Sequence, residues 1–205
     1  MSLWQLVRVG GFTMVILLSF SILSLAIIIE RLLYYRRRSR IRRKDFMSSI
    51  ASELNKRNIP EAIKICKKTD TPFSSVVHTG LNLYSHDEVV ISNAMEREVT
   101  IETTRLEHLT SIVGTIGSTA VYIGLFGTVL GIIRAFHDIS RSGSGGVDIV
   151  INGISEALVC TAAGLCVAVP AVIAYNYFVK KVDTFITDME LCASEVMDLL
   201  NIRQK

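Results

Sequence analysis

Three stretches of this 205-residue chain contain no charged residue over a length that could cross a lipid bilayer. They cover residues 9–29, 109–133 and 157–179. Each exceeds the roughly 18–20 residues needed to span a hydrocarbon core about 30 Å thick. Half of the residues are hydrophobic (50%), which fits membrane helices better than a soluble domain. The pattern predicts an all-α membrane protein with three transmembrane helices, the first of them an uncleaved anchor.

The region between the first two spans contains prolines and a capping motif that are typical of the starts of short helices. "IPEAIKICKKT" (59–69) and "TPFSSVVHTGLNLY" (71–84) each have a proline, Pro60 and Pro72, where a first helical turn would begin. Ser85 followed by Glu88 matches a capping box. Because no proline follows until Pro170, we expect one continuous helix over 87–138, extending well beyond the membrane.

The third span leads into a helix with one apolar stripe. The stripe consists of Val182, Phe185, Ile186, Met189, Cys192, Val196 and Leu199, spaced three or four residues apart. We expect the extensions of the second and third spans to pack as a bundle. We also expect the chain to oligomerise, because one copy is too short to cover all its apolar stripes.

"SRSGSGG" (140–146) is the clearest loop signal in the chain, and helical character should resume near Val147. The predicted organisation is a periplasmic lead-in and first transmembrane helix (1–35), a cytoplasmic helical region (36–108), a second transmembrane helix (109–136), a periplasmic loop (137–146), a third transmembrane helix (147–180) and a cytoplasmic C-terminal helix (181–205).

A run of basic residues after the first span sets the expected orientation. It includes Arg36, Arg37, Arg38, Arg40, Arg42 and Arg43. Basic residues close to span ends remain in the cytoplasm, so residues 34–108 and the C-terminus should be cytoplasmic and the N-terminus periplasmic. At this juxtamembrane position, contact with lipid headgroups is a better explanation for the arginines than nucleic-acid binding.

Motifs for enzyme chemistry are missing from the sequence. The four cysteines form no CxxC pair, and two of them lie in the third span, so no disulfide framework or metal site is expected. No nucleophile–base set and no phosphate-binding loop with its lysine is present. We therefore expect neither an enzyme nor a bound cofactor.

Small residues punctuate the second span. Gly117, Gly124 and Gly131 are seven residues apart, and Gly127 with Gly131 forms a small-xxx-small pair. In lipid, such glycines allow two helix backbones to approach closely, so we expect them to pack helices. Thr128 shares a face with Gly117 and Gly124, which could form a tight seam or the wall of a narrow pore. In the third span, Pro170 removes a backbone donor and indicates a local kink.

Glu156 is the candidate functional residue. With the helix starting near Val147, its carboxylate would lie two to three turns inside the third span. A charge at the bilayer centre costs about 2.5–3.5 kcal/mol on insertion scales, and such residues commonly mark ion or proton pathways. The alternative is an interfacial Glu156 that pairs with Arg134 or Arg141. Thr161 lies about 140° from Glu156 around the helix, so both can line one lumen only if the exposed face is broad.

Two motifs, "YIGLFGTVLGIIRAF" and "GISEALVCTAAGLCVAVPAVIAYNYF", closely resemble the transmembrane motifs of the MotA/TolQ/ExbB proton-channel family, in its ExbB/TolQ branch. The resemblance implies a homo-pentameric bundle whose second and third helices surround a central pore. It also implies an ExbD- or TolR-like single-span partner, present as a dimer inside that pore. On the matching positions, Glu156, Thr128 and Thr161 would face the pore near the partner's aspartate. Val121 and Leu130 depart from the family pattern, which often has proline and tryptophan there.

The resemblance further implies an inner-membrane proton channel that energises TonB-dependent outer-membrane transport through a TonB- or TolA-like periplasm-spanning protein. A TolQ-like role in the Tol-Pal envelope system is the alternative, as are a paralogue for motility or secretion and a non-conducting scaffold. The lack of further polar ligands favours protons over sodium, without deciding between them.

Overall fold

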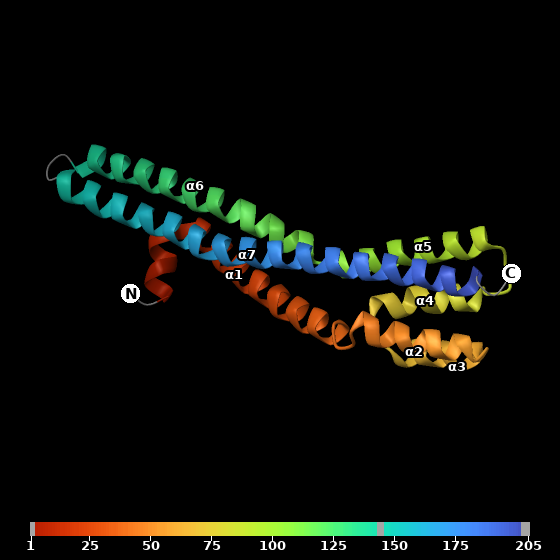
Figure 1. Ribbon diagram of the computed structural model, residues 1–205. Helices are drawn as coiled ribbons and strands as arrows, with labels where there is room; N and C mark the ends of the chain where they lie inside the picture. The colour runs from red at the N-terminus through yellow and green to blue at the C-terminus, as the bar shows by residue number, and fades with distance from the viewer. Residues whose placement is uncertain (1–2, 143–145, 202–205) are drawn as a thin grey trace. The chain divides into compact units, whose positions relative to one another are not determined.

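The computed structural model describes residues 3–142 and 146–201, with side chains described for 11–140 and 150–200. These residues form helices joined by short turns, with no strand among them, so the predicted all-α class is confirmed. The helices are α1 (Leu3–Arg38), α2 (Arg43–Asn55), α3 (Ile59–Lys68), α4 (Pro72–Asn82), α5 (Glu88–Glu107), α6 (Thr110–Ser142) and α7 (Gly146–Asn201) (Figure 1).

Three of the described helices, α1, α6 and α7, are long and apolar enough to cross a membrane. This confirms the three spans predicted from the charge-free stretches. The chain divides into two compact units, and each is described separately below.

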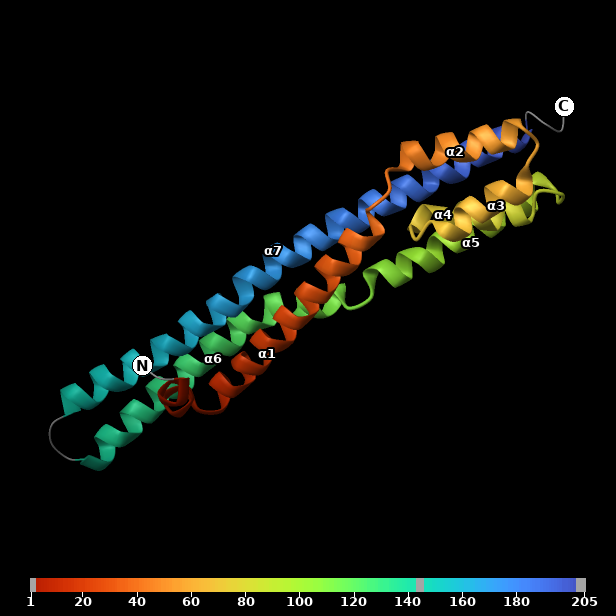
Figure 2. The ribbon, with the colours of Figure 1, turned by 90° about the horizontal axis from the view of Figure 1, so that it is seen from below.

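The first unit comprises Met1–Glu30 and Leu109–Tyr177. Within it, α6 and the first part of α7 lie side by side and run in opposite directions (Figures 1 and 2). Leu17 of α1 packs with Ala120 of α6 and Ala168 of α7 in its core. The fully buried residues that α6 and α7 contribute to this cluster are both alanines, and Val121, Ile123 and Val167 pack around them.

A break near the start of α1 accompanies a left-handed glycine. Gly11 has φ +56° and ψ −142°, a combination that essentially only glycine adopts. The apolar helix therefore begins at Gly11, after a short helical lead-in.

The second unit comprises Arg31–His108 and Phe178–Lys205. Here α2 packs on α3, α3 on α4, and α4 on α5. Phe46 of α2 and Phe73 of α4 have ring centroids 5.1 Å apart. The expected short helices, α3 and α4, are confirmed with proline in their first turns, and Asn58 Oδ1 caps α3 by accepting a hydrogen bond from the Glu61 amide at 3.3 Å.

The stripe on the C-terminal part of α7 is covered within this unit. Five of its members, Val182, Phe185, Met189, Cys192 and Val196, are buried. Tyr35 of α1 contributes to this cover, with its ring 6.1 Å from that of Phe185. The chain's own helices thus fold back onto this stripe, whereas many apolar side chains of α6 and of the first part of α7 are exposed in one copy.

The single helix expected over 87–138 is also wrong. Helix α5 starts after an N-cap at Asp87, not Ser85, and ends at Glu107. Leu109 then has φ +66°, and α6 begins at Thr110. The Tyr35 hydroxyl donates a 2.8 Å hydrogen bond to the Leu106 carbonyl, an oxygen that a continuing helix would have paired with the amide four residues later. A tertiary hydrogen bond from Tyr35 thus satisfies a backbone carbonyl at the end of α5.

Helix α6 extends further than expected at its other end. It continues to Ser142, beyond the predicted boundary at 136. No glycine or proline occurs between 137 and 142, so nothing in that segment stops the helix. The remainder of the expected loop, 143–145, lies outside the described residues.

Candidate ion-pathway site

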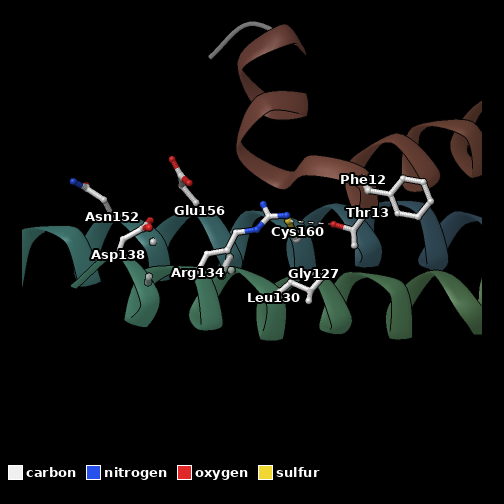
Figure 3. Close-up of a pocket in the computed structure, with 13 residues that line it drawn as sticks. Phe12, Thr13, Gly127, Leu130, Arg134, Asp138, Asn152, Glu156 and Cys160 are labelled. Carbon is white, nitrogen blue, oxygen red and sulfur yellow. Dashed lines mark hydrogen bonds between the residues drawn. The ribbon is translucent and has the colours of Figure 1, made fainter. Parts of the chain in front are cut away.

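Glu156 lies near the start of α7, two to three turns after Gly146. Its side chain is exposed in the single chain. It lines a cavity of about 340 Å³ in the first unit, between α6, α7 and the start of the apolar part of α1. The polar groups around the cavity come from Thr13, Arg134, Asp138, Asn152, Glu156 and Cys160 (Figure 3).

The polar side chains of this cavity point in different directions. In Figure 3, Glu156 and Asn152 are directed to the same side, whereas the guanidinium of Arg134 extends toward Cys160 and Thr13. Thr13 and Cys160 are buried, and the Thr13 hydroxyl donates to Cys160 Sγ at 3.9 Å. A Cβ placed on Gly11 would lie 3.3 Å from Arg134 Nη1, so the arginine packs against the break in α1.

Pairing of Glu156 with Arg134 was the alternative explanation for this carboxylate. Both residues line the cavity, but among the described side chains no ion pair joins them. The Arg141 side chain lies outside the described residues. Glu156 is therefore left facing open space in one copy of the chain.

Thr128 and Thr161, the two threonines grouped with Glu156 as pore-lining residues, lie outside the cavity that contains Glu156. Thr128 is 9% exposed, and its hydroxyl donates to the Leu125 carbonyl of its own helix at 2.6 Å. The Thr161 Oγ1 atom is buried and has no hydrogen-bond partner among the described residues. Neither residue lines the cavity that contains Glu156. That Thr128, Thr161 and Glu156 face one pore stays a prediction, because such a pore would form only between several copies of the chain.

Glycines of α6 lie against α7 along their contact, which we call the glycine seam. Most of them face backbone or small side chains, and Gly114 at one end faces the ring of Tyr175. A Cβ added to Gly117, Gly124, Gly127 or Gly131 would fall within 2.7–2.9 Å of Val172, Cys160, Cys160 or Ala157, respectively. Gly164 of α7 approaches as closely from the other side, with Ala120 O only 2.7 Å from an added Cβ. The seam fixes the register of α6 against α7 and so the positions of the charged groups. Helix α7 continues without interruption through Pro170.

Asp138 and Asn152 were not expected at the site from the sequence, and Arg134 was expected there only as a possible partner of Glu156. A signal was present: Arg134 and Asp138 are four residues apart on α6, and Asn152 and Glu156 are four apart on α7. Residues with this spacing share a helix face. Two such polar pairs on consecutive antiparallel helices indicate a shared polar patch.

The arginines after the first span lie at the end of α1 and the start of α2, and several of them form ion pairs. The last turn of α1 contains Arg36, Arg37 and Arg38, and Arg40 lies in the turn that follows. Arg42 is the N-cap residue of α2, and Arg43 is the first residue of that helix. Arg38 lies 3.6 Å from both Asp70 and the buried Glu102. Arg43 pairs with Asp188 at 3.5 Å and with Glu195, and the hydrogen bond to Glu195 raises the pKa of its guanidinium. Several of these arginines therefore stabilise the second unit, which the sequence pattern did not indicate.

The described residues contain no group of three His, Cys, Asp or Glu side chains that could hold a metal ion. Burial raises the pKa of the Cys66 and Cys192 thiols to about 12, so neither supplies a thiolate near neutral pH. The polar group around Glu156 is thus the candidate site.

Comparison with known proteins places these features in a family. The family model described as "MotA/TolQ/ExbB proton channel family" matches residues 68–191, more than half of the chain. A Biopolymer transport protein ExbB of Neisseria meningitidis is 30% identical over 95% of this chain and 93% of its own length. A Tol-Pal system protein TolQ of Haemophilus influenzae is 35% identical over 85% of this chain and 81% of its own.

A Biopolymer transport protein ExbB of Xanthomonas campestris is 42% identical, but over only 48% of this chain and 42% of its own length. The chain thus spans less than half of that relative, although it matches the Neisseria protein almost from end to end. Together with the three membrane-length helices, the family match leads to one conclusion: the chain belongs to the MotA/TolQ/ExbB proton channel family.

Proposed function

We propose that this protein is an inner-membrane stator subunit that conducts protons together with a single-span, ExbD-like partner. The observation that carries the proposal is the carboxylate of Glu156, which lines a polar cavity on a helix long enough to span the membrane. An ionisable group at this depth is costly and commonly marks an ion route.

The chain requires a second titrating group from elsewhere. Residues 109–133 and 157–179 contain no carboxylate, so Glu156 alone cannot hand protons across the membrane. We propose that a partner helix, bound inside a homo-pentamer, supplies an aspartate near Thr128 and Thr161. On assembly, the buried Thr161 hydroxyl would gain the hydrogen-bond partner that it lacks in one copy.

Proton flow would then drive the partner helices and pass work to a periplasm-spanning protein. Both ExbB and TolQ proteins occur among the relatives, and we favour the ExbB-like role in energising TonB-dependent outer-membrane transport. The arginines after α1 support an orientation with the second unit in the cytoplasm. A TolQ-like role remains the alternative, and adjacent tonB-like or tolA-like genes would discriminate the two.

The test is proton uptake by vesicles containing the chain and its single-span partner, measured with a pH-sensitive dye under an imposed gradient. We expect Glu156→Gln to reduce uptake to the level of protein-free vesicles, because it removes the charge while retaining the shape. Glu190→Gln is the matched control, since Glu190 is an exposed carboxylate further along the same helix. Uptake unchanged by Glu156→Gln would refute the assignment.

The glycine seam also supports a second candidate, a scaffold that conducts nothing. A scaffold predicts that Glu156→Gln and Thr161→Val leave uptake at the wild-type value while bulky replacements of Gly124 prevent assembly. Native mass spectrometry of the detergent-solubilised complex measures assembly separately from flux, so the two candidates give different pairs of results.

A further inference from the structure

A basic groove lies in the second unit and shares no residue with the cavity that contains Glu156. It has a volume of about 520 Å³, within the range of ligand pockets. Its cations are Arg38, Arg42, Arg43, Lys44 and Lys181, and its carboxylates are Asp45 and Asp188. Phe73, Phe185 and Ile41 supply apolar walls.

The arginines of this groove are already engaged, whereas the lysines are not. Arg42 Nε lies 2.9 Å from Asp45, and Arg43 Nε lies 3.5 Å from Asp188, so both groove carboxylates are neutralised. Among the described residues, no carboxylate pairs with Lys44 or Lys181. Lys181 instead holds its ammonium 5.2 Å from the centre of the Phe185 ring. The groove therefore has two uncompensated positive charges.

The start of α2 adds backbone donors to the same groove. Its N-cap residue, Arg42, makes no side-chain capping hydrogen bond, and the first amides of a helix have no partner within the helix. The residues of this first turn, from Arg43 to Asp45, line the groove. Free amides, the positive end of a helix and two lysines together form a setting that favours a phosphate group.

In sequence, the residues of this groove lie close to the ends of two membrane-length runs. Lys181 follows the charge-free run 157–179 almost immediately, and Arg38 to Lys44 lie at and just after the end of α1. Lipid headgroups occupy the layer adjoining the hydrocarbon core, and basic pockets at span ends bind anionic headgroups. The apolar wall of Phe185 and Ile41 suits the glycerol and first methylenes of a lipid.

We propose that this groove binds the phosphate of an anionic phospholipid headgroup, with Lys44, Lys181 and the first amides of α2 as its ligands. Free inorganic phosphate would use the same chemistry, and only the lipid would also use the apolar wall. The proposal does not depend on proton conduction, so it stands or falls separately from the proposed function.

The experiment is a titration of the full-length protein in neutral detergent with short-chain phosphatidylglycerol, short-chain phosphatidylcholine and inorganic phosphate, each followed by native mass spectrometry. We expect saturable binding of phosphatidylglycerol and a roughly thirty-fold weaker affinity in the Lys44→Gln/Lys181→Gln variant, as for the loss of two interfacial cations. The Lys67→Gln/Lys68→Gln variant removes two exposed lysines of α3 outside the groove, and it should bind like the wild type.

Several outcomes would overturn the proposal. Equal binding of phosphatidylcholine and phosphatidylglycerol would show that charge plays no part. An equal loss in the two lysine pairs would show a general charge effect without a groove. If inorganic phosphate binds as tightly as the lipid, the lipid assignment fails and the groove is a site for free phosphate.

Discussion

A single methyl group at Gly164 should force α6 and α7 apart. The added Cβ would lie 2.7 Å from Ala120 O and 3.0 Å from Gly124 Cα, both backbone atoms that no rotamer change can move. Ordinary contact begins near 3.4 Å, so the helices must separate locally by about 0.7 Å. Overpacking of this kind costs about 1–3 kcal/mol, and a rigid backbone neighbour favours the upper half of that range.

Alanine also has an intrinsic advantage over glycine in a helix, of up to about 1 kcal/mol. The net destabilisation expected for Gly164→Ala is therefore about 1–2 kcal/mol, or a melting temperature lowered by about 2–8 °C at this chain length. The assay is thermal unfolding of the purified protein in detergent, followed by far-UV circular dichroism.

Gly114→Ala is the matched control because it makes the same substitution in the same seam. An added Cβ there would meet the ring of Tyr175 at 2.9 Å, and a side chain at the edge of the seam can turn away. We expect this variant to melt at or slightly above the wild-type temperature. The reasoning is refuted if Gly164→Ala melts no lower than the wild type, or if both variants are destabilised equally.

Three further predictions concern the second unit. Glu102→Ala should lower the free energy of unfolding of this unit by about 3 kcal/mol, which is the lower end of the range for breaking a buried ion pair. The lower end applies because Arg38 retains its ion pair with Asp70. Chemical denaturation measures this loss, and a loss below about 1 kcal/mol would contradict the prediction. Burial lowers the pKa of His78 in the folded protein. Below about pH 6.5 the unfolded chain therefore binds more protons at this residue than the folded chain, and the free energy of unfolding should fall on acidification. His78→Gln should reduce this pH dependence, and an unchanged dependence of stability on pH would contradict the prediction. Cys66 and Cys192, with thiol pKa values of about 12, should resist maleimide at about pH 8 until the protein unfolds, and rapid labelling of the native protein would contradict their burial.

The spans and the short helices were predictable because their signals are local. Charge-free length alone identified α1, α6 and α7, and Pro60 and Pro72 marked the first turns of α3 and α4. Such features depend on a few consecutive residues, so a single sequence is sufficient to read them.

The break between α5 and α6 was not predictable in this way. It occurs without glycine or proline, at a carbonyl bound by Tyr35, which lies 71 residues earlier in the chain. The cover over the α7 stripe has the same origin, because it depends on which helices return to that face. Both features follow from tertiary contacts that periodicity does not encode.

The candidate site was only half visible in the sequence. Glu156 was found because a charge in an apolar run is conspicuous. Its companions Arg134 and Asp138 required the register of α6 against α7, which the glycine spacing indicates as a contact but does not fix. The sequence thus indicated the chemistry of these residues but not the register of α6 against α7 that brings them together.

The composition of the glycine seam has a consequence for how the protein can respond to a proton gradient. The described contacts of Gly117, Gly124, Gly131 and Gly164 are with backbone atoms, a valine and alanines, which carry no charge from about pH 4 to 8. Acidification over this range therefore adds no charge to the contacts of these four glycines. If Glu156 takes up a proton, as the proposed function requires, the change of charge falls on a side chain that is not part of these contacts.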